Sequence, residues 1–236
     1  EVIDCDLAEI LRKAGCFELY ETIVKSLDLE GVSPGHQFDA YYTLASSLIN
    51  QAKYDEAIRV GLKASTLAQV TGNNEHQIKA LGLLVVCHSA QGDFIRAQSE
   101  MSAIQGFRDL VAPELFVREQ ARGLQTYAMM KAYDRAIELF DAIADDFVRY
   151  VSDQSAHAIA FYTVGNCYFQ LSRFCEAERC YQKGYAAAEK FPAMLLECQI
   201  GLARVRHELS GRSSWSEVKQ IEERFGRAAR SRLSFV

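Results

Sequence analysis

The chain has 236 residues, of which 49% are hydrophobic, and its formal net charge is −5. This apolar content is ample for a continuous core, while three prolines and fourteen glycines exclude long Pro- or Gly-rich linkers. The mildly acidic charge argues against nucleic-acid binding. No apolar run reaches the roughly 18 residues that a membrane span needs, and no basic-then-apolar leader opens the chain. Neither a nucleic acid nor a membrane is therefore an expected partner.

Apolar residues at helical spacing predict pairs of helices along the whole chain. In the first pair, over residues 1–34, Ile3, Leu7 and Leu11 form one stripe and Gly15 makes the turn. The following pairs are predicted over residues 38–72, 78–112, 117–152 and 158–191. All three prolines fall between pairs, where a helix must stop or begin.

The last pair, over residues 194–232, is less regular. A helix is predicted from Met194 to Leu209, ending at Gly211. Ser214, with Glu217 three residues later, has the spacing of a capping box and starts the final helix. The whole pattern predicts twelve helices in six antiparallel pairs, forming one domain over residues 1–236.

An aromatic residue opens the second helix of the first five pairs, at intervals of 37 to 41 residues, in the order Phe17, Tyr54, Phe94, Tyr133 and Phe174. Three positions later the chain has Tyr20, Ala57, Ala97, Ala136 and Ala177. A small residue at this position lets two helices approach closely, so four of the five pairs are expected to pack alike.

The fifth pair shows the motif most fully, from Ala158 to Tyr185. Gly165 and Ala177 lie where its two helices must touch, and Tyr168 and Phe174 stand beside them. This stretch resembles the tetratricopeptide repeat. The resemblance implies an all-α, right-handed superhelix of about six repeats with a concave groove. The interval near 39 residues exceeds the usual 34 or so, and is similar to regulatory arrays of bacterial signalling proteins, transcription regulators and peptide-pheromone receptors.

In such arrays the first helix of each pair lines the groove. The positions not used for packing predict a peptide-binding surface made of Tyr42, Ser46, Asn50, Lys79, Arg118, Arg122, Gln125, Tyr162, Asn166 and Gln170. Ile49, Gly82, Val86, Ser89, Ala121, Met129 and Phe169 are assigned to the same surface. Asparagine and glutamine offer both donors and acceptors to a peptide backbone. The alternative is that these residues solvate an unused groove.

Arg118 and Arg122 are four residues apart, so they point the same way and could bind one carboxylate. They match the two basic positions that chaperone-binding tetratricopeptide domains use to hold a C-terminal carboxylate. The other positions of that clamp are occupied by Tyr42, Ser46 and Leu83, which does not fit. A chaperone tail is therefore not the expected ligand, and an anionic group of another ligand remains open.

No sequence pattern indicates catalysis. Phosphate-binding loops, nucleophile elbows and His-Glu-x-x-His are absent. The five histidines are scattered over different pairs, and His88 occupies a position where the motif has tyrosine, so it is expected to fill the core. The adjacent Asp145 and Asp146 face different directions on a helix and cannot form an acid–base couple. We expect no enzymatic activity.

Seven cysteines are spread through the chain and none forms a Cys-x-x-Cys pair. Cys175 and Cys180 are five apart, which separates them around a helix. Metal-ligand spacing is absent, so no metal or cofactor is expected. Reduced structural thiols in a cytoplasmic protein are the natural interpretation, and the lack of Asn-x-Ser/Thr agrees with it.

The segment from Arg204 to Arg232 holds eight Lys or Arg against four Glu, while the rest of the chain is acidic. A solvated capping helix whose cations complement its C-terminal dipole explains this charge. The alternatives are a docking surface for an acidic partner, a dimer contact through this last helix, or a helix leading into an output domain. The chain begins at Glu1 without Met, which is compatible with a piece of a longer protein.

The sequence thus predicts a non-enzymatic protein- or peptide-binding module. The alternative is a sensory or regulatory domain of a larger bacterial signalling protein or transcription regulator, similar to a peptide-pheromone receptor, whose output domain is missing from this chain. The identity of the partner and the oligomeric state are not predicted.

Overall fold

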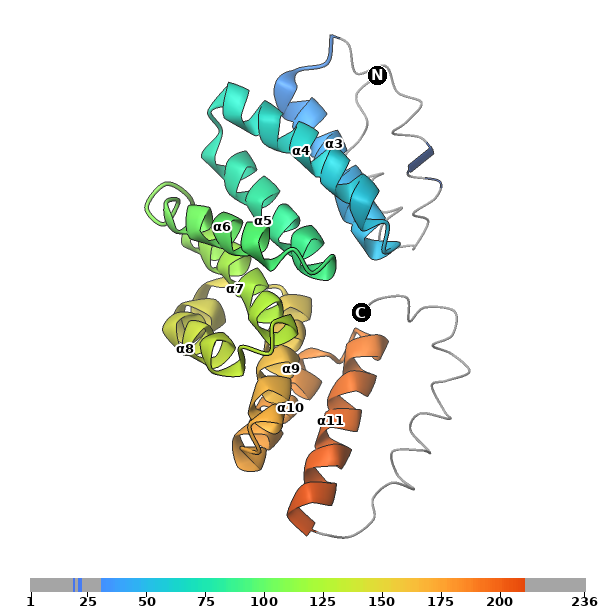
Figure 1. Ribbon diagram of the computed structural model, residues 1–236, viewed down its shortest axis with the longest axis vertical. Helices are drawn as coiled ribbons and strands as arrows, with labels where there is room; N and C mark the ends of the chain where they lie inside the picture. Colours follow the sequence, from blue (N-terminus) through green and yellow to red (C-terminus); the bar gives the residue numbers. More distant parts are fainter. Residues whose placement is uncertain (1–18, 20, 23–30, 211–236) are drawn as a thin grey trace. The chain divides into compact units, whose positions relative to one another are not determined.

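A computed structural model describes residues 19, 21–22 and 31–210 of the chain. From residue 31 onward it contains the helices α3 (Pro34–Asn50), α4 (Tyr54–Thr71), α5 (Asn74–Ala90), α6 (Phe94–Gln105), α7 (Pro113–Met129), α8 (Tyr133–Tyr150), α9 (Gln154–Gln170), α10 (Phe174–Ala187) and α11 (Pro192–Ser210) (Figure 1). No strand occurs in these ranges. The predicted all-α fold is confirmed over the described part. Most of the first predicted pair, and the final predicted helix with its capping box, lie outside it.

The helices belong to two compact units that divide between Val111 and Ala112. Unit 1 contains α3 to α6, and unit 2 contains α7 to α11. In each unit every helix packs against the next one. In addition, α3 contacts α5 in unit 1, while α9 contacts α7 and α11 in unit 2. Contacts between the first helices of successive pairs are the stacking expected of tandem repeats. One domain over residues 1–236 stays a prediction.

Every described second helix begins at the aromatic residue that marks it in the sequence, namely Tyr54, Phe94, Tyr133 and Phe174. The turn before each aromatic residue has the same geometry. The residue two positions earlier is left-handed, with φ of 56° at Ala52, 77° at Gly92, 59° at Lys131 and 58° at Ser172. The next N–H reaches back five residues, as from Lys53 to the Leu48 carbonyl at 2.9 Å. This is the main bond of a Schellman C-cap.

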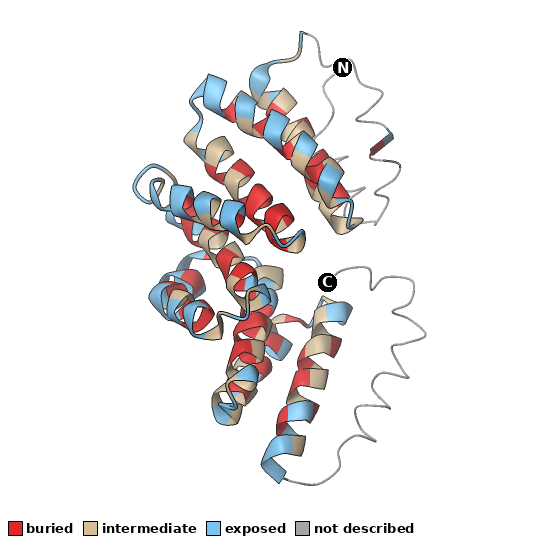
Figure 2. Ribbon diagram, viewed as in Figure 1, coloured by how far each residue is buried: buried red, intermediate tan, exposed pale blue. Residues whose placement is uncertain are grey.

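The alanines three residues after these aromatics are fully buried, as predicted: Ala57, Ala97, Ala136 and Ala177. Ala57 belongs to a core cluster with Leu44, Leu48 and Leu84, which brings α3, α4 and α5 together. Figure 2 shows the result as buried inner faces and exposed outer faces along α4 and α10. The small residue therefore has the packing role that the pattern indicated.

The prolines mark helix starts. Pro34, Pro113 and Pro192 are each the first residue of a helix, where the missing N–H costs nothing and the fixed φ suits the first turn. The second to fifth predicted pairs each begin four residues earlier than the periodicity indicated, at Pro34, Asn74, Pro113 and Gln154. Among the described helices, none is both long and apolar enough to cross a membrane.

Candidate functional site

The predicted surface of unit 1 is partly used for packing. Tyr42 stacks on Phe38, with ring centroids 5.7 Å apart, and packs against the core. The Ser46 hydroxyl donates to the Tyr42 carbonyl oxygen at 2.9 Å. The side chains of Asn50 and Lys79 are half-buried and make no hydrogen bond or ion pair with other described residues. Two of the additional positions are not available for binding, because Gly82 and Ser89 are buried.

On α7, the two predicted arginines lie against a carboxylate of their own helix. The Nε atoms of Arg122 and Arg118 contact the two oxygens of Glu119, the second at 3.4 Å. Glu119 is completely buried, whereas the side chains of Arg118 and Arg122 are 36% and 30% exposed. A buried carboxylate needs compensating charge, which explains why both cations turn toward it.

Two cations of α7 thus face the one carboxylate of Glu119. Arg118 also interacts with Asp153, which caps α9. Burial alone would raise the pKa of Asp153, but hydrogen bonds from Ser155 and Ala156 and the charge of Arg118 together lower it. Asp153 thus stays ionised at neutral pH, and the remaining exposed part of each guanidinium faces solvent.

Between α9 and α11 lies a cluster that we name the α9–α11 face, consisting of Tyr162, Asn166, Phe169, Glu197 and Arg204. The Tyr162 hydroxyl donates to Glu197 Oε2 at 2.8 Å. Burial, followed by the proximity of Glu197, raises the pKa of Tyr162 to about 12, so the hydroxyl keeps its proton. The Arg204 guanidinium lies 5.0 Å from the centre of the Phe169 ring. The polar and aromatic groups of the two helices therefore meet on one face.

Tyr181 of α10 supports this face from below. It is 1% exposed, and its hydroxyl donates to Asn166 Oδ1 at 2.7 Å. Burial raises the pKa of this tyrosine as well. Its ring lies against Gly165 and Gly201, where a Cβ atom would come within 2.9 and 2.7 Å of ring atoms. The glycines of α9 and α11 thus make room for Tyr181 between the two helices.

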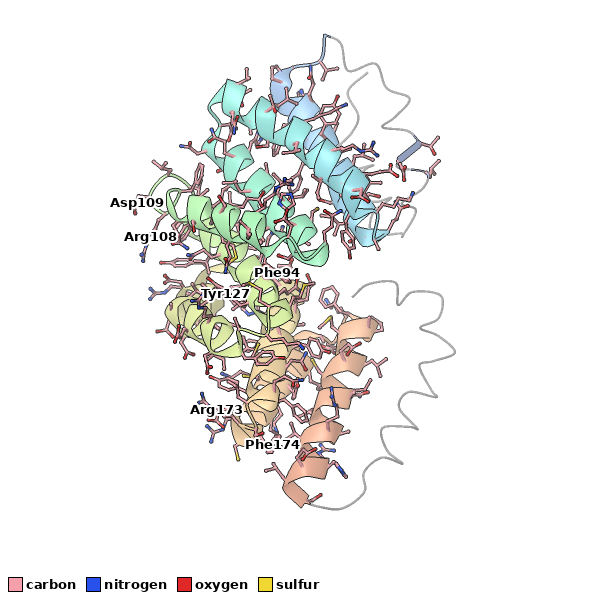
Figure 3. All side chains as sticks on the ribbon, in the orientation of Figure 1. Phe94, Arg108, Asp109, Tyr127, Arg173 and Phe174 are labelled. Atoms are coloured by element: carbon pink, nitrogen blue, oxygen red, sulfur yellow. The ribbon has the colours of Figure 1, made fainter. Side chains whose placement is uncertain are left out.

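The remaining predicted residues of unit 2 are Gln125 and Gln170, and both are exposed. Gln170 is the last residue of α9, and the turn after it ends at Arg173, just before Phe174 begins α10 (Figure 3). Sequence reasoning missed Glu197 and Arg204 because the sixth pair lacks the repeat motif. Their spacing of seven residues, two helical turns on one face, is the signal that could have identified them.

Three cysteines of unit 2 lie in surroundings that keep the thiol protonated. Burial raises the pKa of Cys167 and Cys180 to about 11 each and that of Cys198 to about 12. These thiols stay protonated at neutral pH and pack as small apolar groups. No group of His, Cys, Asp or Glu that could hold a metal ion occurs among the described residues.

His88 fills the core, as expected, with 4% of its surface exposed. Its Nδ1 atom lies 2.9 Å from Glu100 Oε1. This contact joins α5 to α6 in unit 1 and is the pairing through which a buried imidazole satisfies its polar atom.

Comparison with family models gave no match, and none was found among curated proteins. Solved structures do match, and one of them is the crystal structure of NprR in complex with its cognate peptide NprX, with a TM-score of 0.71 at 16% identity. The match covers 97% of this chain and 66% of that one, so the chain spans about two thirds of the NprR chain. At this identity the likeness concerns the fold alone, which is a tetratricopeptide-like array of helical repeats.

Proposed function

We propose that this chain is a non-enzymatic, peptide-binding helical-repeat domain of the cytoplasm. The observation that carries the proposal is the α9–α11 face, on which uncharged donors and acceptors, an aromatic ring and two opposite charges are gathered on adjacent first helices. NprR, which has a similar fold, was crystallised with a peptide. A peptide ligand is therefore the first class to test.

The chemistry of the face suits such a ligand. Asn166 and Glu197 are half-buried, so each has part of its surface in solvent. Amide and carboxylate groups satisfy the N–H and C=O groups of a peptide backbone. Phe169 adds apolar contact area with few rotatable bonds. The exposed Gln125 and Gln170 extend the donor and acceptor groups along α7 and α9.

The arginines of α7 add a second recognition element. Arg118 and Arg122 both contact Glu119, and their side chains are 36% and 30% exposed. Their partly exposed guanidinium groups suit an acidic side chain or the C-terminal carboxylate of a peptide. The ligand that we propose accordingly carries an anionic group as well as an exposed backbone.

The proposal is tested with the full chain and a displayed library of random heptapeptides with free termini. We expect wild-type protein to enrich particular sequences. For the best synthetic peptide, Gln125→Ala and Gln170→Ala should each weaken binding by about threefold, since each removes one solvent-competed hydrogen bond. Both residues are exposed, so neither change should alter the circular dichroism.

The matched control is Gln182→Ala. Gln182 is equally exposed, but it lies on α10, the second helix of its pair. Its replacement should leave peptide affinity unchanged. An equal loss for all three variants would contradict the placement of the ligand on the first helices, and a library without enrichment would contradict peptide binding itself.

A regulatory role is the second candidate, because the solved chain of similar fold that contains a bound peptide is longer than this chain. A sensor must bind its ligand better in one arrangement of the repeats than in another. Small-angle scattering distinguishes the two candidates. A fixed binding module keeps the same radius of gyration when the selected peptide is added, whereas a sensor changes it.

A further inference from the structure

Two hydrogen bonds between helices meet at the α9–α11 face. The Tyr181 hydroxyl of α10 donates to Asn166 Oδ1 of α9 at 2.7 Å. The Tyr162 hydroxyl of α9 donates to Glu197 Oε2 of α11 at 2.8 Å. Four side chains from three helices are thus held in two pairs.

Each of the two bonds has a direction. A carboxamide oxygen can only accept, so Tyr181 must donate to Asn166 Oδ1. An ionised carboxylate also only accepts, so Tyr162 uses its single proton toward Glu197. The oxygen end of the Asn166 amide is therefore taken by Tyr181, and the nitrogen end is left for other partners.

Tyr181 is able to set this direction because its ring is confined. Gly165 on one side and Gly201 on the other leave no space even for a Cβ atom. Ala177 and Val205, both fully buried, complete the cluster around the ring. The hydroxyl is thus held at one position, and it determines which end of the Asn166 amide turns inward.

The outward groups follow from these directions. The Asn166 oxygen faces Tyr181, so its amide nitrogen, which carries two N–H groups, is the donor that this residue presents. Glu197 Oε1 makes no hydrogen bond or ion pair to a described residue, so Glu197 presents an acceptor. Tyr162, which is bonded to Glu197, precedes Asn166 by four residues on α9, so the donor and the acceptor lie on the same face. An extended peptide directs the C=O and N–H of one residue to the same side, which matches this pair of groups.

We propose that Tyr181 is a positioning residue, and that Asn166 and Glu197 select an extended peptide segment by donating to a backbone carbonyl and accepting from a backbone N–H. This assignment rests on the proposed peptide-binding function and specifies the part of the ligand that is recognised. Asn166 and Glu197 bind the backbone of the ligand, whereas the side chains of the ligand contact other residues.

The test uses the tightest heptapeptide selected from the random library on the full wild-type chain. Each backbone amide of this peptide is replaced in turn by an ester, which removes one N–H and weakens one carbonyl acceptor. In wild-type protein one or two replacements should weaken binding by about five- to tenfold, the size of one net hydrogen bond. Those positions identify the amides that meet Asn166 and Glu197.

Tyr181→Phe keeps the ring and removes only the hydroxyl. We expect it to weaken binding of the unmodified peptide by about fivefold and to abolish the extra loss at the ester position that faces Asn166, because the amide is then free to turn over. Asn166→Asp, which replaces the donor by an acceptor, should weaken binding by more than about tenfold. The matched control is Tyr168→Phe, which removes a hydroxyl without a hydrogen bond to any described residue and should change nothing.

The outcomes are separable. If Tyr181→Phe leaves the ester profile as in wild type, or weakens every analogue by the same factor, the positioning role is wrong while peptide binding stands. If Tyr181→Phe does not fold, Asn166→Asp decides, because a profile unchanged by that variant would also overturn the inference. If wild-type protein selects no heptapeptide, the proposed function fails and this inference fails with it.

Discussion

The two units stabilise their buried charges in different ways. In unit 1, His88 of α5 pairs with Glu100 of α6, one group from each helix. In unit 2, Glu119 is paired with Arg118 and Arg122, which belong to the same helix as the carboxylate. The first arrangement joins two helices and consumes both groups. The second lies within α7, although the charge of Arg118 also reaches Asp153 at the start of α9, and its two cations are partly exposed.

The two units also differ in what packs against their helical glycines. Gly61 in unit 1 faces a terminal methyl group of Leu83, the flexible end of a side chain. Gly201 in unit 2 faces the ring of Tyr181, which is buried and hydrogen-bonded. The polar groups of unit 1 are thus used to hold its helices together, whereas unit 2 holds a rigid support beneath groups that are still available to a ligand.

The largest effect is expected from Arg122→Met. Removing one of the two cations leaves Glu119 buried with only the longer contact to Arg118, and such a loss costs about 3 kcal/mol of unfolding free energy. The counterpart in unit 1, His88→Leu, should cost about 1–2 kcal/mol, because Glu100 keeps some contact with water. Urea unfolding of the full chain measures both.

A second change checks the cause. In the double variant Arg122→Met/Glu119→Leu no carboxylate is left buried, so most of the lost stability should return. A double variant that is less stable than Arg122→Met alone would mean that Glu119 stabilises α7 by some other contact, and the distinction between the two units would then lose its basis.

The next effect concerns the glycines. Gly201→Ala should destabilise the protein by about 1–3 kcal/mol, because the new methyl group meets an immobile ring. Gly61→Ala should be close to neutral, since the Leu83 methyl can move and alanine favours a helix by up to about 1 kcal/mol. Thermal unfolding followed by circular dichroism compares them. Equal destabilisation would show that Tyr181 is no more rigidly held than Leu83.

The turn before each second helix occurs in both units, and substitutions there should change the unfolding free energy by a smaller amount, with opposite sign in the two units. Gly92 in unit 1 and Lys131 in unit 2 both have left-handed φ, of 77° and 59°. For a residue with a Cβ atom, this backbone conformation costs about 1 kcal/mol more than it does for glycine. Gly92→Ala should therefore lower the unfolding free energy by about that amount, and Lys131→Gly should leave it unchanged or raise it slightly. Destabilisation by Lys131→Gly would reveal a contact of the lysine side chain.

The smallest effect is a dependence on pH in unit 1. Burial raises the pKa of Glu100 above the ordinary 4.5, although the hydrogen bond from His88 opposes the shift. Between these two pKa values the folded chain binds more protons than the unfolded chain, so this group's contribution to stability is lost as the pH rises through that window. Above pH 4.5, the unfolding free energy of Glu100→Gln should therefore fall less steeply with pH than that of the wild type, as measured by urea unfolding. If the variant keeps the wild-type slope, Glu100 is not the source of this pH dependence.

Much of the fold could be predicted from the sequence because its causes are local. The aromatic residues predicted the starts of α4, α6, α8 and α10, and the alanines three positions later are buried as expected. These features depend on helical periodicity and on the size of one residue at a helix crossing, and neither requires knowledge of distant partners. The starts of α3, α5, α7 and α9 were each predicted four residues too late, because the prediction began each helix at its first periodic apolar residue and so left out the first turn.

The candidate site was only partly predictable for the opposite reason. The sequence by itself identified Tyr162 and Asn166 as surface residues of a first helix, and Arg118 and Arg122 as a pair. Only the tertiary structure decided that Tyr181 holds Asn166, that Tyr162 bonds to Glu197, and that the arginines already face a carboxylate. A hydrogen bond between two helices depends on the angle at which their axes cross and on which residues of the two helices are then adjacent. Packing decides both, and the periodicity of each separate helix contains neither.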